Sequence, residues 1–488
     1  MDYHSEFRQS IDQPDAFWRE KASAIDWMEP PKTIWQPTDN GHGEWFPDGA
    51  LNTSDIALDA NIRAGRGEQK ALIYDSPVTG TTRSYTYNEL TRAVATFAGA
   101  LQDRGITKGD RVILYMPMIP EAVIAMLGCA RIGAIHSVVF GGFASNELAV
   151  RIDDAKPKAV ITASCGIEVS KVIEYKPLVD KAIDQADHKP ECCIVFQRPQ
   201  AKATLQEGRD FDWGEMVSRA RAVDPVPVRA TDPLYILYTS GTTGKPKGVV
   251  RDNGGHAVAL RYSMHLVYDA SPGDVYWAAS DVGWVVGHSY IVYAPLFAGC
   301  TTILYEGKPV KTPDAGAFWR VVQDHGVNLL FTAPTAFRAV RKEDPEADQL
   351  SRYDISSLKT VTYGTEPMPE STLKRFSKLF PDINLLQTYG LSEVGILRSK
   401  SKSTDSLWVK IGGEGFETRV VDGMLEIKAK SAMLGYLNAP SPFTEDGWFK
   451  TGDMAVCNQA GFYRIVDRKK GMFISGGEKV YPVEVEGG

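Results

Sequence analysis

Short apolar runs alternate with amphipathic stretches over most of the chain, from residue 71 to residue 386. Short β-branched and apolar runs bounded by turn residues predict strands, and longer stretches with apolar residues three or four positions apart predict helices. Strands that alternate with helices favour an α/β fold with doubly wound, mostly parallel sheets. The predicted strands are 71–74, 83–86, 111–116, 134–139, 159–162, 328–332, 359–363 and 384–386, and the predicted helices are 87–104, 121–132, 145–155, 315–325 and 369–380.

The pattern changes toward both ends of the chain. The first 52 residues are rich in Trp, Pro and Asp with little periodicity, which predicts an extended segment wrapped on the body. Short strands and turns predominate after residue 407, and the last residues are typical of a hinge and the start of another domain. A chain of 488 residues is too long for one ordinary core. We therefore expect five units: an N-terminal segment at 1–52, α/β subdomains at 53–232 and 233–406, a β-rich subdomain at 407–463, and a truncated C-terminal domain at 464–488.

Composition and charge narrow the classes of protein. With 43% hydrophobic and 24% charged residues, the chain resembles a soluble globular protein. The formal net charge of −7 argues against nucleic acid or an anionic membrane as partner. Residues 283–305 contain no Asp, Glu, Lys or Arg and are long enough to span a bilayer. His288, Ser289 and Pro295 within them favour a buried core segment instead.

The cysteines and the N-terminus bear on the compartment. The six cysteines show neither paired zinc spacing nor the density of a disulfide framework, so they are typical of buried thiols in a reducing compartment. The first residues lack the apolar core of a secretory signal. We therefore expect a cytoplasmic protein.

The stretch with the narrowest chemical meaning is 238–248, which reads Tyr-Thr-Ser-Gly-Thr-Thr-Gly-Lys-Pro-Lys-Gly. An apolar, β-favouring run precedes it and a potential helix at 255–267 follows, so we expect a loop that joins a strand to a helix. Glycine-rich loops in that position present backbone N–H groups to anions. The expected phosphate-binding residues are Thr239, Ser240, Gly241, Thr242, Thr243, Gly244 and Lys245.

This loop differs from the Walker A motif. Only two residues separate Gly241 from Gly244, and Pro246 occupies the position where that motif needs an Mg²⁺-binding hydroxyl. The spacing therefore disfavours a kinase or a P-loop ATPase. A Gly/Ser/Thr turn without a ligand is the simpler alternative, but so long a loop of this composition after a strand favours phosphate binding.

The loop is similar to the signature loop of the AMP-forming adenylate synthetases, a superfamily of acyl-CoA synthetases, nonribosomal-peptide adenylation domains and beetle luciferases. Two further stretches match family motifs in the expected order: 364–367 reads Gly-Thr-Glu-Pro, and 387–393 reads Gln-Thr-Tyr-Gly-Leu-Ser-Glu. The resemblance implies a nucleotide site in which Gly364, Thr365, Glu366 and Pro367 line one side of adenine, Tyr389 stacks on its other side, Thr388 contacts the nucleotide, Ser392 reaches phosphate, and Glu393 with Thr239 holds Mg²⁺.

Two motifs near the C-terminus extend the resemblance. Residues 446–453, Asp-Gly-Trp-Phe-Lys-Thr-Gly-Asp, are similar to the ribose motif, and Asp453 is suited to accept from both ribose hydroxyls. Residues 463–470 match the hinge motif, which implies that Arg468 contacts ribose or phosphate and that Lys470 is the pivot. The family's α+β lid, with a catalytic lysine and most of the CoA tunnel, extends well beyond the stretch that corresponds to this chain. The implied catalytic residues here are Thr239, Lys245, Glu393 and Lys470.

The acyl pocket departs from the family pattern. The front two-thirds resembles propionyl- and acetyl-CoA synthetases, in which the positions of Trp284, Val285 and Val286 line the acyl pocket. From about residue 360 the chain resembles medium- and long-chain or aryl-acid ligases, as though the sequence were composite. Gly390 and Gly364 stand where the short-chain enzymes carry tryptophan and valine, which predicts an acid longer or bulkier than propionate. His288 either orients this pocket or is a satisfied core histidine.

These features together predict an ATP-dependent acid:CoA ligase that forms acyl-AMP and then an acyl thioester. Its small molecules would be a carboxylic acid, ATP with Mg²⁺, and CoA; a homo-oligomer stays open. Only Lys171 lies where some acetyl-CoA synthetases place arginines for the 3′-phosphate of CoA. Because most of the lid is outside this chain, we expect slow adenylation and weaker thioester formation. The alternatives are an acyl-AMP ligase that loads a carrier-protein thiol and a catalytically weak nucleotide-binding fragment.

Overall fold

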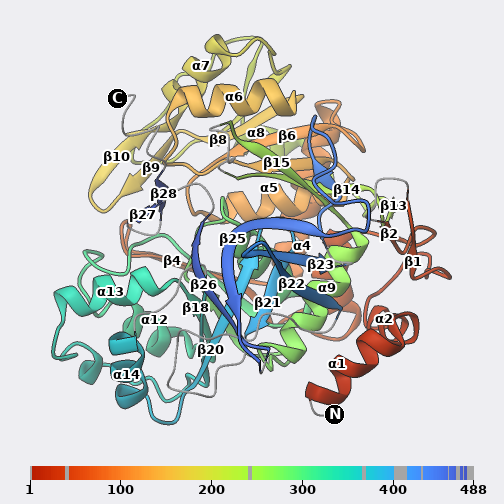
Figure 1. Ribbon diagram of the computed structural model, residues 1–488. Coiled ribbons are helices and arrows are strands. Elements are labelled where there is room, and N and C mark those ends of the chain that lie inside the picture. Colours follow the sequence, from red (N-terminus) through yellow and green to blue (C-terminus); the bar gives the residue numbers. More distant parts are fainter. Residues whose placement is uncertain are drawn as a thin grey trace.

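Two eight-stranded sheets with helices on both faces form the body of the protein, and a four-stranded antiparallel sheet lies against them (Figure 1). The structure, a computed structural model, describes residues 3–38, 43–239, 245–364, 370–399, 415–429, 432–459, 461–468, 473–475 and 478–480. This architecture confirms the α/β class with mixed, doubly wound sheets.

The first large sheet has the strand order β12-β11-β8-β6-β7-β14-β15-β24. Its strands are parallel from β12 to β14, whereas β15 runs antiparallel to both β14 and β24. The bounds are β6 (Arg111–Tyr115), β7 (Ile135–Val138), β8 (Ala159–Ala163), β11 (Cys192–Phe196), β12 (Asp210–Asp212), β14 (Pro233–Thr239), β15 (Lys247–Asp252) and β24 (Gly435–Tyr436).

The second large sheet has the strand order β21-β20-β19-β18-β16-β17-β4-β5, parallel except for an antiparallel pair at each edge. It takes β4 and β5 from before residue 232 and its other strands from after it, so the two sheets draw strands from both sides of that expected boundary. The bounds are β4 (Lys70–Ser76), β5 (Thr81–Thr86), β16 (Val275–Ala278), β17 (Thr301–Tyr305), β18 (Leu329–Thr332), β19 (Thr360–Tyr363), β20 (Asn384–Leu391) and β21 (Gly395–Ser399).

Helices fill the space between the sheets and cover their outer faces, because strand side chains point alternately to the two sides. In β6, Val112 and Leu114 belong to the core between the sheets, whereas Ile113 belongs to the core under the outer helices. The inner helices are α4 (Tyr87–Asp103), α5 (Pro120–Arg131), α9 (Gly254–Leu266), η2 (His288–Tyr293) and α11 (Ala294–Phe297). The outer helices are α6 (Ser145–Ala155) and α7 (Tyr175–Gln185) on the first sheet, and α12 (Ala317–His325), α13 (Pro334–Glu343) and α14 (Glu370–Leu379) on the second.

The remaining elements are small or belong to the β-rich part. The four-stranded sheet comprises β22 (Phe416–Val421), β23 (Met424–Ala429), β25 (Phe449–Cys457) and β26 (Tyr463–Arg468). Two-stranded pairs are β1 (Trp35–Gln36) with β2 (Glu44–Trp45), β3 (Ala50–Leu51) with β13 (Val228–Arg229), β9 (Cys165–Glu168) with β10 (Lys171–Glu174), and β27 (Phe473–Ser475) with β28 (Glu478–Val480). Short helices are η1 (Asp55–Asp59), α3 (Ala60–Arg63), α8 (Trp213–Arg219), α10 (Val285–Gly287) and η3 (Leu350–Arg352).

The expectation of an extended N-terminal segment is corrected by two helices, α1 (Tyr3–Asp12) and α2 (Pro14–Ala22), which lie beside α9 (Figure 1). Phe17 and Trp18 of α2 are buried, and both rings contact the ring of Tyr262 on α9, with centroids 5.6 and 5.7 Å away. The helices form because tertiary burial of these aromatic residues overrides a weak local pattern.

The connection after β14 also differs from the expectation. The glycine-rich loop joins β14 to β15, and the two strands form an antiparallel hairpin in which Thr239 pairs with Lys247. Helix α9 begins only after β15. The β-branched pair Val249 and Val250 explains the extra strand, because such residues fit a pleated surface better than a helix start. The loop is therefore presented by a hairpin rather than by a strand and a helix.

The run without Asp, Glu, Lys or Arg folds as α10, η2, α11 and β17. In the described part of the chain, no helix combines the length and apolar character that crossing a bilayer requires.

Candidate active site

Two residues expected at opposite parts of a nucleotide meet in the structure. Tyr389 on β20 donates its hydroxyl to Oδ2 of Asp453 on β25 at 2.5 Å, although the two are 64 positions apart. Asp453 is 4% exposed, and its backbone N–H donates to the hydroxyl of Thr451. The residues expected to contact adenine and ribose are thus adjacent. Fixed polar groups of this kind bind a ligand with less loss of side-chain entropy.

Glu393 lies just beyond this pair, in the turn between β20 and β21. Its Oε1 accepts a hydrogen bond from the hydroxyl of Tyr436 on β24 at 2.9 Å, and its carbonyl accepts from the backbone N–H of Met433 at 2.7 Å. Burial, together with the neighbouring Glu393 carboxylate, raises the pKa of Tyr436 well above its usual value, so this hydroxyl stays a donor. Tyr436 was not anticipated from the sequence, because no motif connects it to Glu393.

The start and the end of the phosphate loop lie on the β14–β15 hairpin, and β24 with Tyr436 pairs with β15. The ammonium group of Lys247 lies 5.0 Å above the ring of Tyr436, and Val249 of β15 pairs with Tyr436 in the sheet. Lys245 is exposed beside the loop. The five loop residues expected to bind phosphate between Thr239 and Lys245 lie outside the described residues: Ser240, Gly241, Thr242, Thr243 and Gly244.

Arg251 is a second residue that the sequence analysis missed. It is 3% exposed on β15, and its Nη2 donates to the carbonyl oxygen of Ser392 at 2.7 Å. This bond ties the loop hairpin of the first sheet to the Ser392–Glu393 turn of the second. The sequence shows only an arginine in an apolar strand, and its burial, which arginine rarely tolerates without partners, appears only in the structure.

The donor set around Glu393 suits Mg²⁺. In the described residues, no group of three or more His, Cys, Asp or Glu side chains is arranged to hold a metal. Mg²⁺ needs no such cage, because it keeps several waters and is usually held by one or two carboxylates together with substrate phosphates. The half-buried Glu393 carboxylate, oriented by Tyr436, supplies that kind of ligand. Thr239 at the end of β14 would add a hydroxyl.

Gly364 has a packing reason for lacking a side chain. A Cβ there would lie 2.4 Å from Oγ1 of Thr388, a distance that real Cβ atoms do not show. The Thr388 hydroxyl in turn donates to the carbonyl of Tyr363 at 3.3 Å. The space gained at Gly364 is therefore filled by Thr388, and the argument for a longer acyl pocket depends on Gly390 alone. Thr365, Glu366 and Pro367 lie outside the described residues.

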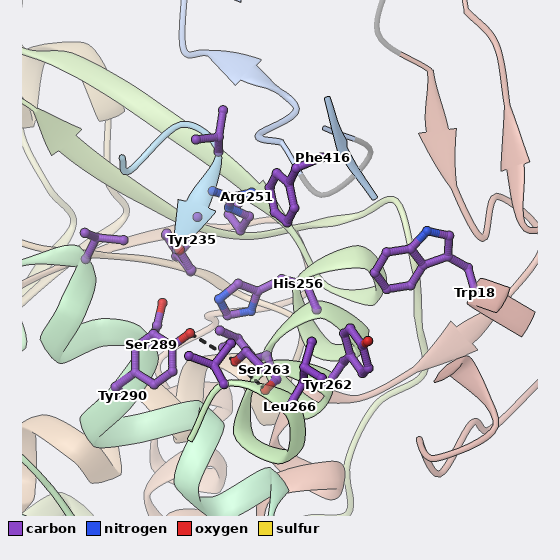
Figure 2. A pocket seen from close by; sticks show the side chains of 16 residues that line it. Trp18, Tyr235, Arg251, His256, Tyr262, Ser263, Leu266, Ser289, Tyr290 and Phe416 are labelled. Carbon is purple, nitrogen blue, oxygen red and sulfur yellow. Dashed lines mark hydrogen bonds between the residues drawn. The ribbon is translucent and has the colours of Figure 1, made fainter. Parts of the chain in front are cut away.

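The side chains of the three consecutive residues expected to line the acyl pocket have different surroundings. Trp284 is 41% exposed, and its ring lies 5.3 Å from that of Phe140. Val286 is buried in the core, whereas Val285 lines a cavity between α9 and the Glu393 turn. Figure 2 shows this cavity, whose wall includes His256, Tyr262 and the rings of Trp18 and Phe416.

His288 is a core histidine in this structure. It is fully buried, and its Nδ1 lies 2.6 Å from the carbonyl oxygen of Val282. Its ring stacks on that of His136 with centroids 5.3 Å apart. Burial lowers the pKa of His288 to about 4, so the ring is neutral at physiological pH.

The hinge residues are only partly described. Asp453 and Arg468 are direct partners in the β25–β26 ladder, which puts both positions at the same level of the sheet. Lys470 lies outside the described residues, so its place as a pivot stays a prediction.

Comparison with known families identifies the class. The model of the AMP-binding enzyme family matches residues 60–429, and a model described as acetyl-coenzyme A synthetase N-terminus matches residues 3–57. The first match covers well over half of the chain, which therefore belongs to the AMP-binding enzyme family. The second match includes α1 and α2.

Individual relatives agree with this assignment. The chain is 59% identical over 372 residues to an uncharacterized protein of Pseudomonas aeruginosa, covering 76% of this chain and 59% of that protein. It is 51% identical over 384 residues to the human mitochondrial acyl-CoA synthetase short-chain family member 3, covering 78% and 55%. With the propionate–CoA ligase of Salmonella typhimurium, identity is 42% over 419 residues, covering 85% and 66%. The chain thus matches less than two thirds of the length of these relatives.

A solved structure shows the same fold. Acetoacetyl-CoA synthetase from Streptomyces lividans superposes with a TM-score of 0.86 over 97% of this chain and 76% of that one, at 23% sequence identity.

Proposed function

We propose that this chain activates a carboxylic acid as acyl-AMP at the expense of ATP and, in the full reaction, passes the acyl group to the thiol of CoA. The observation that carries the proposal is the hydrogen bond between Tyr389 and Asp453, beside Glu393 and the end of the phosphate-loop hairpin. Matches to the AMP-binding family and to acyl-CoA synthetases support it.

The chemistry explains why these groups must converge. A carboxylate oxygen attacks the α-phosphorus of ATP, an O–P bond forms, and the bond to pyrophosphate breaks with the electron pair leaving on pyrophosphate. Acid and triphosphate repel each other, so the site must supply N–H donors and cations where charge develops. Bound Mg²⁺ would neutralise phosphate charge. The thiolate of CoA then attacks the acyl carbonyl carbon, and AMP departs as the C–S bond forms.

Each described residue has a role in this scheme. Tyr389 would stack on adenine while its hydroxyl orients Asp453 toward the ribose, and Lys245 would meet phosphate at the mouth of the loop. Glu393 and Thr239 would hold Mg²⁺. Gly390 would leave room for an acid longer than propionate. Thr388 and Ser392 would border the nucleotide, with Ser392 held in place by Arg251.

The test is acid-dependent exchange of pyrophosphate into ATP, with acids of increasing length. It is run on this chain and on the same chain extended by the C-terminal residues of the Pseudomonas aeruginosa relative. We expect exchange that rises in the extended chain and needs the acid. ATP binding by calorimetry without exchange in either protein would contradict the proposal. Transfer to a holo carrier protein but not to CoA would show that the carrier-protein thiol is the acceptor.

A further inference from the structure

The cavity beside Val285 borders the expected acyl end of the site. Gly395 lines it and pairs with Leu391 in the β20–β21 ladder, which puts the wall next to Gly390. Val394, the residue after Glu393, lines it as well. A chain attached to a carboxylate near Glu393 could therefore enter where Gly390 carries no side chain.

The far end of the cavity is built from elements distant in sequence. Trp18 of α2, Tyr262 of α9 and Phe416 of β22 line it (Figure 2), and Leu260 of α9 lines it as well. The volume is about 70 Å³. A single water needs only about 10–15 Å³ on the same measure, so the cavity accepts a group of several non-hydrogen atoms. Most of its lining is aromatic or aliphatic, which suits a hydrocarbon chain.

Two side chains in this lining, Trp18 and His256, have ring nitrogens without a hydrogen-bond partner among the described residues. His256 on α9 is 6% exposed, and among the described residues neither of its ring nitrogens makes a hydrogen bond. Figure 2 shows its imidazole in the middle of the lining side chains. Burial and the nearby charge of Arg251 lower the pKa of His256 well below its usual value, so the ring is neutral and offers one donor and one acceptor. A buried polar group left unpaired destabilises the protein, and a ligand that supplies the missing partner removes that cost.

Apart from Trp18 and His256, the polar side chains along the wall already make hydrogen bonds. The hydroxyls of Ser263 and Tyr290 lie 3.0 Å apart and hydrogen-bond to each other. Arg251 donates to the carbonyl of Ser392. The indole Nε1 of Trp18 can only donate, whereas the His256 ring offers both a donor and an acceptor in the middle of the lining, so His256 is the better partner for an oxygen on the ligand.

We propose that the cavity binds the chain of a medium-length aliphatic acid that carries a neutral oxygen, a hydroxyl or a keto group, hydrogen-bonded to His256. The inference rests on the proposed function, because the reacting carboxylate must point to the nucleotide for the chain to point into the cavity. The acid class is thus oxygenated medium-chain acids, and Trp18 of the N-terminal helix limits their length.

The first experiment tests the place of binding by calorimetry on the purified chain with ATP present, using unbranched acids from propionate to decanoate. Ala259 lines the cavity, so Ala259→Phe fills it. We expect this variant to weaken binding of hexanoate and octanoate at least tenfold, and that of propionate far less. Val150→Phe, at a 46% exposed position on α6, is the matched control and should bind every acid as the parent does.

The second experiment tests the hydrogen bond. Hydroxy and keto derivatives of hexanoate and octanoate, with the oxygen at successive chain positions, are compared with the parent acids in the natural chain and in His256→Leu. In the natural chain, the best-placed oxygenated acid should bind about tenfold tighter than its parent, equivalent to about 1.4 kcal/mol. The preference should vanish in His256→Leu, whereas plain octanoate should still bind.

The outcomes separate the two proposals. Equal binding of octanoate to the natural chain and to Ala259→Phe would refute binding in the cavity. A preference for oxygenated acids that survives in His256→Leu would refute the hydrogen bond to His256. If dicarboxylic acids bound tighter than hydroxy and keto acids, the preference for a neutral oxygen would be wrong. Pyrophosphate exchange with propionate alone would preserve the proposed function and refute this inference. Acid binding in the cavity without exchange would refute adenylation and leave the cavity assignment standing.

Discussion

The proposed nucleotide side of the site and the proposed acyl side are built in opposite ways. On the nucleotide side, Tyr389, Asp453, Glu393 and Tyr436 are joined in polar pairs from separate strands. On the acyl side, an apolar cavity surrounds His256, which has no hydrogen-bond partner among the described residues. A site whose polar groups are paired is set for one ligand that does not vary. A mostly apolar pocket with few unpaired polar groups selects its ligand by length and by hydrogen bonding.

The largest effect on this contrast is expected from removing the Glu393 carboxylate on the nucleotide side. Glu393→Ala should lower acid-dependent pyrophosphate exchange at least about 100-fold, because one group that stabilises developing charge is typically worth that much. Tyr436→Phe keeps the carboxylate and removes only its hydrogen bond, so it should cost about tenfold or less. Acid binding in the cavity should persist in both variants. Equal losses in the two variants would show that Tyr436, not the charge of Glu393, is the essential group.

Asp252, which precedes the cavity-lining helix α9, gives a prediction about how the stability of the fold depends on pH. Asp252 is 6% exposed and accepts from the backbone N–H of Gly255 at 2.7 Å, at the start of α9. Burial raises its pKa to about 6, against the partial opposition of Arg251. The folded state therefore holds this proton more tightly than the unfolded state, so the stabilisation is present below about pH 4 and is lost as pH rises through 6.

Asp252→Asn removes this titration while keeping an oxygen for the Gly255 N–H. Relative to the natural chain, the variant should gain stability as pH rises from 4 to 6, by about 3 kcal/mol at most. Thermal unfolding of both proteins at matched pH values measures the difference, which should be flat above pH 7. A difference that does not change with pH would mean that Asp252 ionises normally in the folded protein.

The contrast between the two sides also explains what the sequence could predict. The nucleotide residues lie in short contiguous motifs whose spacing is visible in one chain, and those that the structure describes converge. The cavity is assembled by Trp18, His256 and Phe416 from three distant segments, so only tertiary packing reveals it. Tyr436 and Arg251 escaped notice for the same reason.

The fold shows the same division. Strands and helices with strong periodicity, such as β6 and α4, lie where the pattern predicted them. Helix α4 even starts where Thr86 and Glu89 form a capping box. Helices α1 and α2 were missed because their stability comes from burying aromatic rings against α9, which a local pattern does not contain.

A milder change tests whether the polar pairing on the nucleotide side matters for binding. Tyr389→Phe keeps the stacking surface but removes the hydroxyl that bonds to Asp453. Nucleotide affinity, measured by calorimetry with a non-hydrolysable ATP analogue, should fall about five- to tenfold, the net worth of one typical hydrogen bond of about 1 kcal/mol. Tyr363→Phe is the matched control, because its hydroxyl lies 3.4 Å from Gln387 Oε1 and away from Asp453. An equal loss of affinity in the control would show that the Tyr389–Asp453 hydrogen bond makes no specific contribution to nucleotide binding.

The smallest expected effect decides which residues define the acyl side. The resemblance implies that Trp284 lines the acyl pocket, whereas its ring is 41% exposed beside Phe140 and Phe143, and its neighbour Val285 lines the cavity. Trp284→Ala should therefore change octanoate affinity less than about threefold, since deleting a half-exposed ring outside the cavity removes little buried apolar contact. Val285→Phe should weaken octanoate much more, because the larger side chain occupies the space of the acid. If Trp284→Ala instead abolished octanoate binding while Val285→Phe was tolerated, the chain of the acid would follow the exposed face of Trp284, and the contrast between a paired nucleotide side and an enclosed acyl side would fail.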